Sequence, residues 1–453
     1  MNSNRANFRV NGRWNEPRSC FAGLWYGAGR AIVRGAQLFA FLLAGLLTAA
    51  PMARAQTQSV LYSFCSQANC ADGADPTGSL AQDAQGNVYG TTLYGGVHSK
   101  GTVFKVTASG TETVLHSFAG NEGAGPEGGL IWDAKGNLYG TTAGAGYIGV
   151  EDQIYFGSAF ELEKHSFKFL HRFLGSDLAN GATPTSGLVR DAQGNAYGTT
   201  LYGGAYPCGD GYGCGIVFKV SPSRTQTVLY NFSGGADGEN PNGSLVIDSD
   251  GNLYGTTDLG GGSGDGCLEA AGCGTVFKVT PDGTETVLYR FTGEGDGGRP
   301  LAGLVMDSQG NLYGTTAEGG TSCGGVGCGT VFEMSASGTE TVLYNFAGGT
   351  DGEGPWAGLV RDAEGNLYGT TIGGGVTSCD GGDGCGTVFK VTPGGTETVL
   401  YRFTGGTDGA IPYGGLTMDG EGNLYGATIA GGVGACEPFG KATGCGVVFK
   451  VTP

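Results

Sequence analysis

The chain has 453 residues, of which 94 are glycine, and a formal net charge of −17. The glycines follow no every-third-residue period, which excludes collagen, and 22 Phe and 20 Tyr argue against disorder, because disordered chains lack the aromatic residues that build a core. The acidity excludes nucleic acid as a partner and disfavours anionic lipid, since both require a basic surface.

Residues 1–55 have the features of a secretory signal peptide that is removed from the mature protein. Several arginines are followed by an apolar run from Leu38 to Leu47 and by Ala53-Arg54-Ala55, a small-x-small cleavage pattern. The apolar run is too short to span a bilayer comfortably, so export is favoured over a membrane anchor and the mature chain has no membrane span. This leader holds 7 of the 24 basic and 1 of the 41 acidic residues, so the mature chain carries a charge near −23.

Residues 56–453 consist of one tandem repeat. The phrase Gly-Asn-x-Tyr-Gly occurs seven times, at spacings of 50 to 59 residues, with its asparagine at positions 87, 137, 195, 252, 311, 366 and 423. Each repeat contains four short β-branched and aromatic runs, A to D, which the fourth full copy shows at Gly243–Asp248, Asn252–Thr257, Gly274–Thr280 and Thr284–Phe291. Such runs between glycine clusters are strand signals, and no stretch has a helical period.

The order of the runs predicts a closed ring. The mature chain opens with a lone D run at Val60–Phe64 and ends with a C run at Gly446–Val451, so the seventh repeat is complete only if the first strand joins it. We therefore predict an all-β fold, a seven-bladed β-propeller of four-stranded antiparallel blades, closed by the N-terminal strand completing the last blade. An open linear array is the alternative architecture.

The mature chain contains twelve cysteines in six close pairs. An even count in an exported chain predicts disulfides, and zinc is disfavoured because no pair is Cys-x-x-Cys and no histidine follows at ligand spacing. The expected disulfides are local: Cys65–Cys70, Cys208–Cys214, Cys267–Cys273, Cys323–Cys328, Cys379–Cys385 and Cys436–Cys445.

The repeat resembles a known family. Gly-Leu-Val-x-Asp-x-x-Gly-Asn-Leu-Tyr-Gly-Thr-Thr at Gly303–Thr316 and Gly358–Thr371, with Gly-Thr-Val-Phe-Lys-Val-Thr-Pro at Gly386–Pro393, resembles the GloVer tandem repeats of exported bacterial choice-of-anchor proteins. The resemblance implies a secreted or surface-attached propeller without a particular activity. No apolar tail or sorting motif follows Val451, so we expect a periplasmic or extracellular protein without a C-terminal anchor. More distantly, Asp-x-x-Gly-Asn-x-Tyr is similar to the A–B hairpin of NHL-type propellers, which include binding proteins and enzymes.

The candidate ligand-binding residues lie where the repeats differ. Antiparallel strands place all B–C and D–A connections at one end of the ring, and variable loops on a rigid scaffold commonly bind ligands. Trp356 and Arg299 occupy D–A positions that differ between repeats, and Tyr147, Glu151 and Asp152 belong to a divergent B–C loop. Aromatic and arginine side chains could stack on sugar rings or grip carboxylates, but for each residue taken alone a structural role is favoured, packing between blades for Trp356 and a rim salt bridge for Arg299.

A second acidic set in the D–A loops has two interpretations. Glycine-rich loops with carboxylates can bind calcium, yet Asp-Gly also forms ordinary turns, and no EF-hand spacing is present. The residues concerned are Asp237, Glu239, Asp296, Asp351, Glu353 and Asp408. No other cofactor is expected.

The motifs predict a binding protein more than an enzyme, but they leave the question open. Four histidines form no triad or metal pattern, and neither a Gly-x-Ser-x-Gly elbow nor a P-loop is present, so no catalytic residue is predicted. We expect a secreted, monomeric interaction module whose variable loops bind a glycan or a protein. The alternatives are a secreted propeller enzyme of lyase or glycoside hydrolase type that uses loop-face carboxylates, and a structural envelope protein.

Overall fold

The computed structural model describes residues 56–453 except 145–154, 165, 175–177, 209–210, 263–271, 322, 324–326, 380–381 and 437–443. The signal peptide predicted at residues 1–55 and the loop residues Tyr147, Glu151 and Asp152 lie outside this part of the chain. Within the described residues, no helix has the length and apolar character needed to cross a membrane. The only helical elements there are two single turns of 3-10 helix, η1 (Ala68–Cys70) and η2 (Leu178–Asn180).

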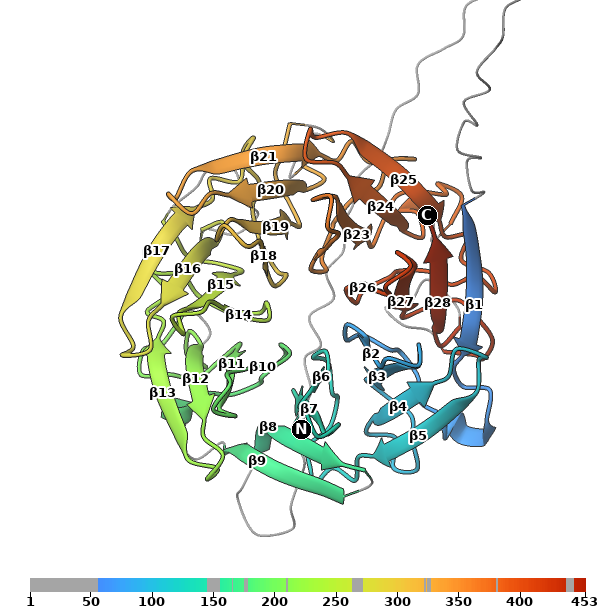
Figure 1. Cartoon of the computed structure of the whole chain (residues 1–453), viewed down its shortest axis with the longest axis horizontal. Coiled ribbons are helices and arrows are strands. Elements are labelled where there is room, and N and C mark those ends of the chain that lie inside the picture. Colours follow the sequence, from blue (N-terminus) through green and yellow to red (C-terminus); the bar gives the residue numbers. More distant parts are fainter. Residues whose placement is uncertain are drawn as a thin grey trace, which may run out of the picture. The chain divides into compact units, whose positions relative to one another are not determined.

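The described strands form seven four-stranded antiparallel sheets, or blades, arranged around one axis (Figure 1), which confirms the predicted propeller. In blades 1 to 6 the strands run outwards in chain order. These strands are β2 (Ala81–Gln82), β3 (Val88–Thr92), β4 (Thr102–Val106) and β5 (Glu112–Ser117); β6 (Ile131–Trp132), β7 (Leu138–Thr142), β8 (Tyr155–Glu163) and β9 (Ser166–Leu174); β10 (Val189–Arg190), β11 (Ala196–Thr200), β12 (Ile216–Val220) and β13 (Gln226–Asn231); β14 (Val246–Ile247), β15 (Leu253–Thr257), β16 (Thr275–Val279) and β17 (Glu285–Arg290); β18 (Val305–Met306), β19 (Leu312–Thr316), β20 (Thr330–Met334) and β21 (Glu340–Asn345); and β22 (Val360–Arg361), β23 (Leu367–Thr371), β24 (Thr387–Val391) and β25 (Glu397–Arg402).

Blade 7 joins the two ends of the propeller. It consists of β26 (Thr417–Met418), β27 (Leu424–Thr428), β28 (Val447–Thr452) and, as its outermost strand, β1 (Thr57–Ser63). β1 pairs antiparallel with β28, with Thr57 opposite Thr452 and Ser63 opposite Val447. The predicted closure by the first strand is therefore confirmed, and the open array is wrong.

Each blade buries its faces against both neighbours. A buried phenylalanine at the end of each outermost strand meets a buried phenylalanine in the third strand of the next blade, edge to face, with ring centroids 4.9–5.4 Å apart. The pairs are 64–104, 118–160, 173–218, 232–277, 291–332, 346–389 and 403–449. This contact continues through the closure, because Phe64 of blade 7 packs on Phe104 of blade 1. Closing the ring leaves no blade with an uncovered apolar face.

The aspartate that occurs in every A–B turn has a local structural role. In blade 1, Asp83 accepts hydrogen bonds from the backbone N–H of Gln85 (3.0 Å) and of Asn87 (2.9 Å), from the Asn87 side chain (2.7 Å) and from the Tyr89 hydroxyl (2.9 Å). Burial opposes ionisation of Asp83, but these donors hold its pKa below the ordinary value. The Asn and Tyr contacts recur in the other blades, so this carboxylate builds the turn, as predicted from its presence in every repeat.

Candidate functional site

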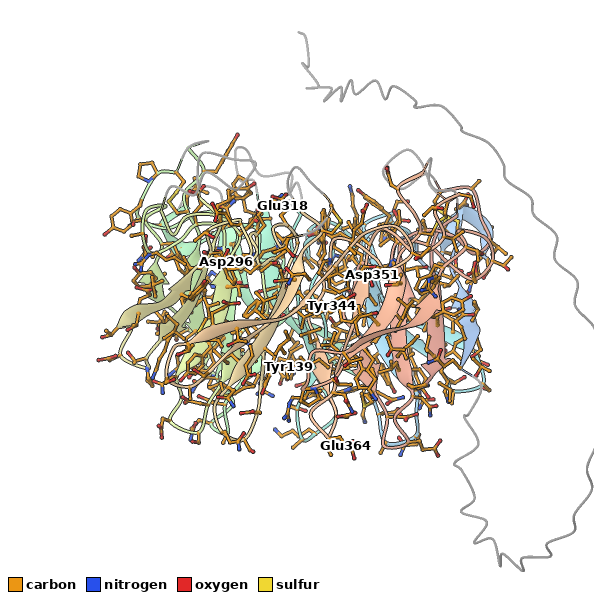
Figure 2. The ribbon with its side chains drawn as sticks, turned by 90° about the horizontal axis from the view of Figure 1, so that it is seen from above. Tyr139, Asp296, Glu318, Tyr344, Asp351 and Glu364 are labelled. Atoms are coloured by element: carbon orange, nitrogen blue, oxygen red, sulfur yellow. A yellow bond between two sulfur atoms is a disulfide. The ribbon has the colours of Figure 1, made fainter. Side chains whose placement is uncertain are left out.

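The two ends of the ring differ in their connections. The B–C and D–A connections lie at one end, which we call the loop face, and the short A–B and C–D turns lie at the other, the turn face. Figure 2 shows this separation: Glu318, which follows β19, lies at the loop face, and Glu364, in the turn between β22 and β23, lies at the turn face.

The D–A connections bring one variable residue from every blade to a cavity of about 290 Å³ on the ring axis. Each of these residues follows a proline and precedes two small residues, so the sequence is x-Pro-X-small-small in all seven blades. The X residues, which we call the channel ring, are Thr77, Glu127, Thr185, Asn242, Leu301, Trp356 and Tyr413. Seven blades with the same strand arrangement therefore place five chemically distinct kinds of side chain at equivalent positions around the cavity.

The backbone of these connections is fixed by hydrogen bonds between neighbouring blades. In blade 5, the N–H of Arg299 donates to the carbonyl of Cys273 in blade 4 (2.8 Å), and the carbonyl of Arg299 accepts from the N–H of Ala317 (3.0 Å). The first of the two threonines within several second strands holds the next channel loop, as Thr141 of β7 does by donating to the carbonyl of Ser186 (2.7 Å). The channel ring is thus anchored on rigid blade structure.

The residue before each proline has a positive φ in every blade, and in five blades it is not glycine. These residues are Asp75, Thr183, Asn240, Arg299 and Ile411, with φ between 55° and 58°. Such a backbone costs on the order of 1–3 kcal/mol, and for β-branched Thr183 and Ile411 it is a marked outlier. Strain of this kind is commonly kept where a binding site requires it, so these positions form a strained rim around the cavity.

One side of the cavity is aromatic. The rings of Trp356 and Tyr413 meet edge to face with centroids 5.6 Å apart, and Leu301 lines the same cavity. Burial, and then the charges of Glu127 and Asp258, raise the pKa of the Tyr413 hydroxyl, so it is a neutral hydrogen-bonding group.

The remaining lining is polar and acidic. The Thr185 hydroxyl donates to the side-chain oxygen of Asn242 (2.6 Å), whereas the hydroxyl of Thr77, a residue that is only 9% exposed, has no hydrogen-bond partner among the described residues. Burial raises the pKa of Glu127, and no ion pair to Glu127 occurs within the described part of the chain. Burial also raises the pKa of Asp75, on the rim, to about 6.

Arg299 is engaged within the protein. Its guanidinium donates to both carboxylate oxygens of Asp258 (2.8 and 3.0 Å) and to Glu318 (3.1 Å). These hydrogen bonds, first those to Asp258, raise the pKa of Arg299 above its ordinary value. Of the two predicted interpretations of Arg299, the structure shows the rim salt bridge, and Trp356 is the predicted residue that lines the cavity.

The acidic residues of the calcium prediction are divided among separate loops. Asp237 accepts from the Tyr230 hydroxyl (2.9 Å) and from the backbone N–H and hydroxyl of Ser233. Asp296, Asp351 and Asp408 have equivalent tyrosine donors, and Figure 2 shows Asp296 and Asp351 in the loop-face half of the ring. Glu239 and Glu353 pair through their backbone with the neighbouring B–C loops. Calcium binding stays a prediction.

Five of the six predicted disulfides are present: 65–70, 208–214, 323–328, 379–385 and 436–445. The sixth cannot be assigned from the described residues, because Cys267 lies outside them. All five belong to connections of the loop face.

Six channel-ring residues were not singled out from the sequence, although a signal for them exists. A proline stands before the X residue in each repeat, at positions 76, 126, 184, 241, 300, 355 and 412. Aligning the repeats on this proline selects the whole ring at once.

Comparison with known proteins adds a family match and two distant structures. The family model described as Gloeobacter/Verrucomicrobia repeat matches residues 51–269 and 268–453. No curated protein matches the chain. A structural-genomics target described as a candidate gluconolactonase is 16% identical, with a TM-score of 0.35, over 69% of this chain and 87% of its own. A gluconolactonase from Xanthomonas campestris is 14% identical, with a TM-score of 0.41, over 87% and 89%.

Proposed function

Because this chain belongs to the Gloeobacter/Verrucomicrobia repeat family and its blades present different residues at equivalent positions around one cavity, we propose that it is an exported binding module with its ligand site at the channel ring. The observation that carries the proposal is the contrast between seven blades of the same strand arrangement and the five kinds of side chain that they bring to one cavity. A residue present in every blade builds blades, whereas a residue that differs is free to recognise a ligand.

A small ligand of glycan type fits this cavity best. A volume of about 290 Å³ is at the lower end for ligand pockets, which favours a single ring over a protein segment. Trp356 offers an aromatic surface for the C–H face of a sugar. Thr77, Thr185 and Asn242 offer hydroxyl and amide groups for sugar hydroxyls.

The charge of the site narrows the ligand further. Glu127 is the one ionisable carboxyl in the channel ring, and the only guanidinium at the rim, Arg299, is engaged by Asp258 and Glu318. An anionic ligand would therefore meet no free cation among the described residues of the site, and the cost of its desolvation would not be offset there. We infer a neutral or cationic ligand.

Export is consistent with the covalent structure. Five disulfides among the described residues are typical of an oxidising compartment, and the basic and apolar leader is the signal that would direct the chain there.

One observation favours an enzyme as the second candidate. Burial raises the pKa of Glu127 and raises that of Asp75 to about 6, and a carboxyl with a raised pKa can act as a general acid near neutral pH. A secreted lyase or glycoside hydrolase that uses these two carboxyls is the alternative that activity assays must address.

The test is a glycan array followed by calorimetric titration of the best ligand. We expect Trp356→Ala to weaken binding by about tenfold, because it removes the stacking surface of roughly 1.4 kcal/mol. Tyr94→Ala is the matched control, since Tyr94 is an exposed loop-face aromatic residue (55% exposed) that does not line the cavity. Equal losses in both variants would place the site elsewhere on the loop face, and turnover of a polysaccharide that Glu127→Gln abolishes would establish the enzyme instead.

A further inference from the structure

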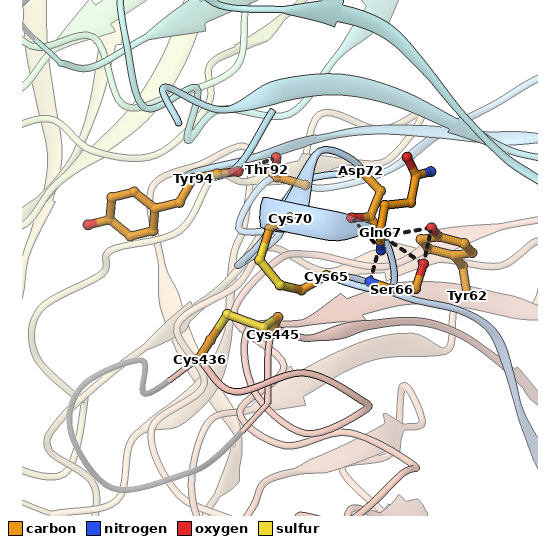
Figure 3. The surroundings of a disulfide bond; sticks show 10 residues. All are labelled: Tyr62, Cys65, Ser66, Gln67, Cys70, Asp72, Thr92, Tyr94, Cys436 and Cys445. Atoms are coloured by element: carbon orange, nitrogen blue, oxygen red, sulfur yellow. Dashed lines mark hydrogen bonds between the residues drawn. A yellow bond between two sulfur atoms is a disulfide. The ribbon is translucent and has the colours of Figure 1, made fainter. Parts of the chain in front are cut away.

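The blade that closes the ring contains a cluster of four sulfur atoms. The disulfides Cys65–Cys70 and Cys436–Cys445 lie side by side (Figure 3), and the four Sγ atoms are all within 4.8 Å of one another. Cys445 is fully buried and the other three are half-buried, so all four pack against the core between blades 7 and 1. One pair comes from the start of the propeller and the other from its end.

The pairing of β1 with β28 ends beside these cysteines. Ser63 lies opposite Val447, and the N–H of Phe64 donates to the carbonyl of Gly446 (3.0 Å). The residues next to this last bond are Cys65 and Cys445, whose backbone groups bond instead to Gly73 and Asp75. The approach is close: a Cβ added at Gly434 would lie 2.7 Å from Cys445 Sγ and 3.1 Å from Cys65 Cβ. The two cysteines that face each other across the closure are therefore in different disulfides.

The other blades with a described disulfide have no such cluster. In those blades a glycine of the D–A connection lies directly against the disulfide; these glycines are Gly234, Gly348 and Gly405. In blade 7 the chain instead carries an extra residue, Cys65, between the core phenylalanine Phe64 and the serine that binds the turn aspartate, Asp72. The second sulfur pair is thus an addition specific to the closure.

We propose that these four sulfurs are a disulfide-exchange site, at which a small-molecule thiol converts the two local disulfides into Cys65–Cys445 and Cys70–Cys436 and so closes the ring covalently. The thiolate attacks Cys70, forms a mixed disulfide there and releases the Cys65 thiolate. Cys65 attacks Cys445 and releases Cys436, which attacks Cys70 and expels the small thiol. Two disulfides are present before and after, and the thiol is regenerated.

The exchange changes what holds the two ends together. With local pairs, β1 is retained in blade 7 by hydrogen bonds and packing alone, so the ring can open by loss of one strand. With Cys65 joined to Cys445, a loop of nearly the whole propeller is closed, and a longer closed loop restricts the unfolded chain more. The exchanged form therefore resists unfolding more strongly, while the folded blades remain the same.

Trypsin separates the two forms of the mature chain, because it cleaves after Lys100, Arg402, Lys441 and Lys450. Local pairing leaves peptide 56–100 on its own and links 403–441 to 442–450. Exchange joins peptide 56–100 to both of the others. After the folded protein is equilibrated with reduced and oxidised glutathione and then alkylated, we expect the three-peptide species and a rise in Tm of about 5 °C. A map that contains only the local pairs after this treatment overturns the proposal.

Two double variants test the geometry without requiring exchange. Cys70→Ala with Cys436→Ala leaves Cys65 and Cys445 as the available partners, and we expect them to form a disulfide in oxidised glutathione. Cys65→Ala with Cys379→Ala leaves single cysteines in separate blade interfaces, so we expect two free thiols to remain, which are alkylated once the protein is unfolded. Free Cys65 and Cys445 thiols in the first variant, once circular dichroism shows it to be folded, contradict the proposal.

Discussion

Four glutamates make the stability of the ring depend on pH. Glu112, Glu285, Glu340 and Glu397 each begin the outermost strand of a blade, and in each the Oε1 atom is shielded from water with no hydrogen-bond partner among the described residues. Burial, and then an aspartate in the D–A loop of the preceding blade, raise the pKa of each from 4.5 to about 7. The folded protein therefore holds these protons more tightly than the unfolded chain does.

The sign of the effect follows from proton linkage. A carboxyl whose pKa is raised on folding contributes stability that is fully present below about pH 4.5 and is lost as the pH rises through about 7. At 1.36 kcal/mol per pKa unit, the rise corresponds to about 3.4 kcal/mol per site before solvent is considered. Because each carboxyl is only half-buried, water screens most of this, and we expect about 1 kcal/mol per site.

Two other blades of this chain have glutamine at the position that these glutamates occupy. Gln58 and Gln226 occupy the same register in blades 7 and 3, and their side-chain amides donate to the carbonyls of Asp408 (3.3 Å) and Asn180 (2.8 Å) in the preceding connections. Glutamine supplies the donor that a glutamate supplies only when it is protonated. Glutamine at the four glutamate positions should therefore remove the loss of stability at high pH.

The assay is urea unfolding of the wild type and of the variant with all four glutamates changed to Gln, at pH 5 and pH 8. We expect the variant to gain about 4 kcal/mol over the wild type at pH 8 and little at pH 5, because distant sites add. Glu364→Gln is the control, since Glu364 is exposed in a turn-face loop and should change neither value. A wild type that is more stable at pH 8 than at pH 5, with no gain in the variant, would refute the reasoning.

Three further substitutions test the contacts that hold the ring. Phe346→Ala should cost about 4 kcal/mol in unfolding free energy, because it removes a buried ring from a blade interface, and a loss under 1 kcal/mol would show that the interface repacks. Gly386→Val should lower Tm by several degrees, since a Cβ there lies 2.6 Å from Pro412 Cδ of the next blade and φ is +88°; an unchanged melt would contradict this. Arg299→Ala should destabilise by about 2 kcal/mol, because it leaves the carboxylates of Asp258 and Glu318 without their cation; a loss under about 0.5 kcal/mol would show that this ion pair contributes little to the fold.

The strands of a blade could be predicted from the sequence because the patterns that indicate them are local. Alternating β-branched and aromatic runs and Asp-x-x-Gly turns act over a few residues, so β15, β16 and β17 fall within the predicted runs. The innermost strand is shorter than predicted, since only Val246–Ile247 of the run Gly243–Asp248 is strand. The residues before it belong to the channel loop. At the equivalent positions of blade 3, the Ser186 carbonyl accepts from Thr141 of blade 2 and the Gly187 N–H donates to Ser244 of blade 4, so these backbone groups bond to neighbouring blades.

The candidate site could be predicted from the sequence only in part, because its residues come from different blades. Trp356 was noticed because its repeat differs there, but Glu127 and Tyr413, which share its cavity, lie hundreds of residues apart in the chain. Arg299 could equally have been free to bind a ligand until the fold placed Asp258 and Glu318 around its guanidinium.

The sequence by itself determined the repeat, its four strands, the number of blades and the closure, since each depends on short-range patterns and on the order of runs along the chain. Only the tertiary structure decided which side chains share the axis and that two disulfides from opposite ends of the propeller meet. Both depend on contacts between separate blades, and ring closure creates those contacts when it brings together residues that are distant in sequence.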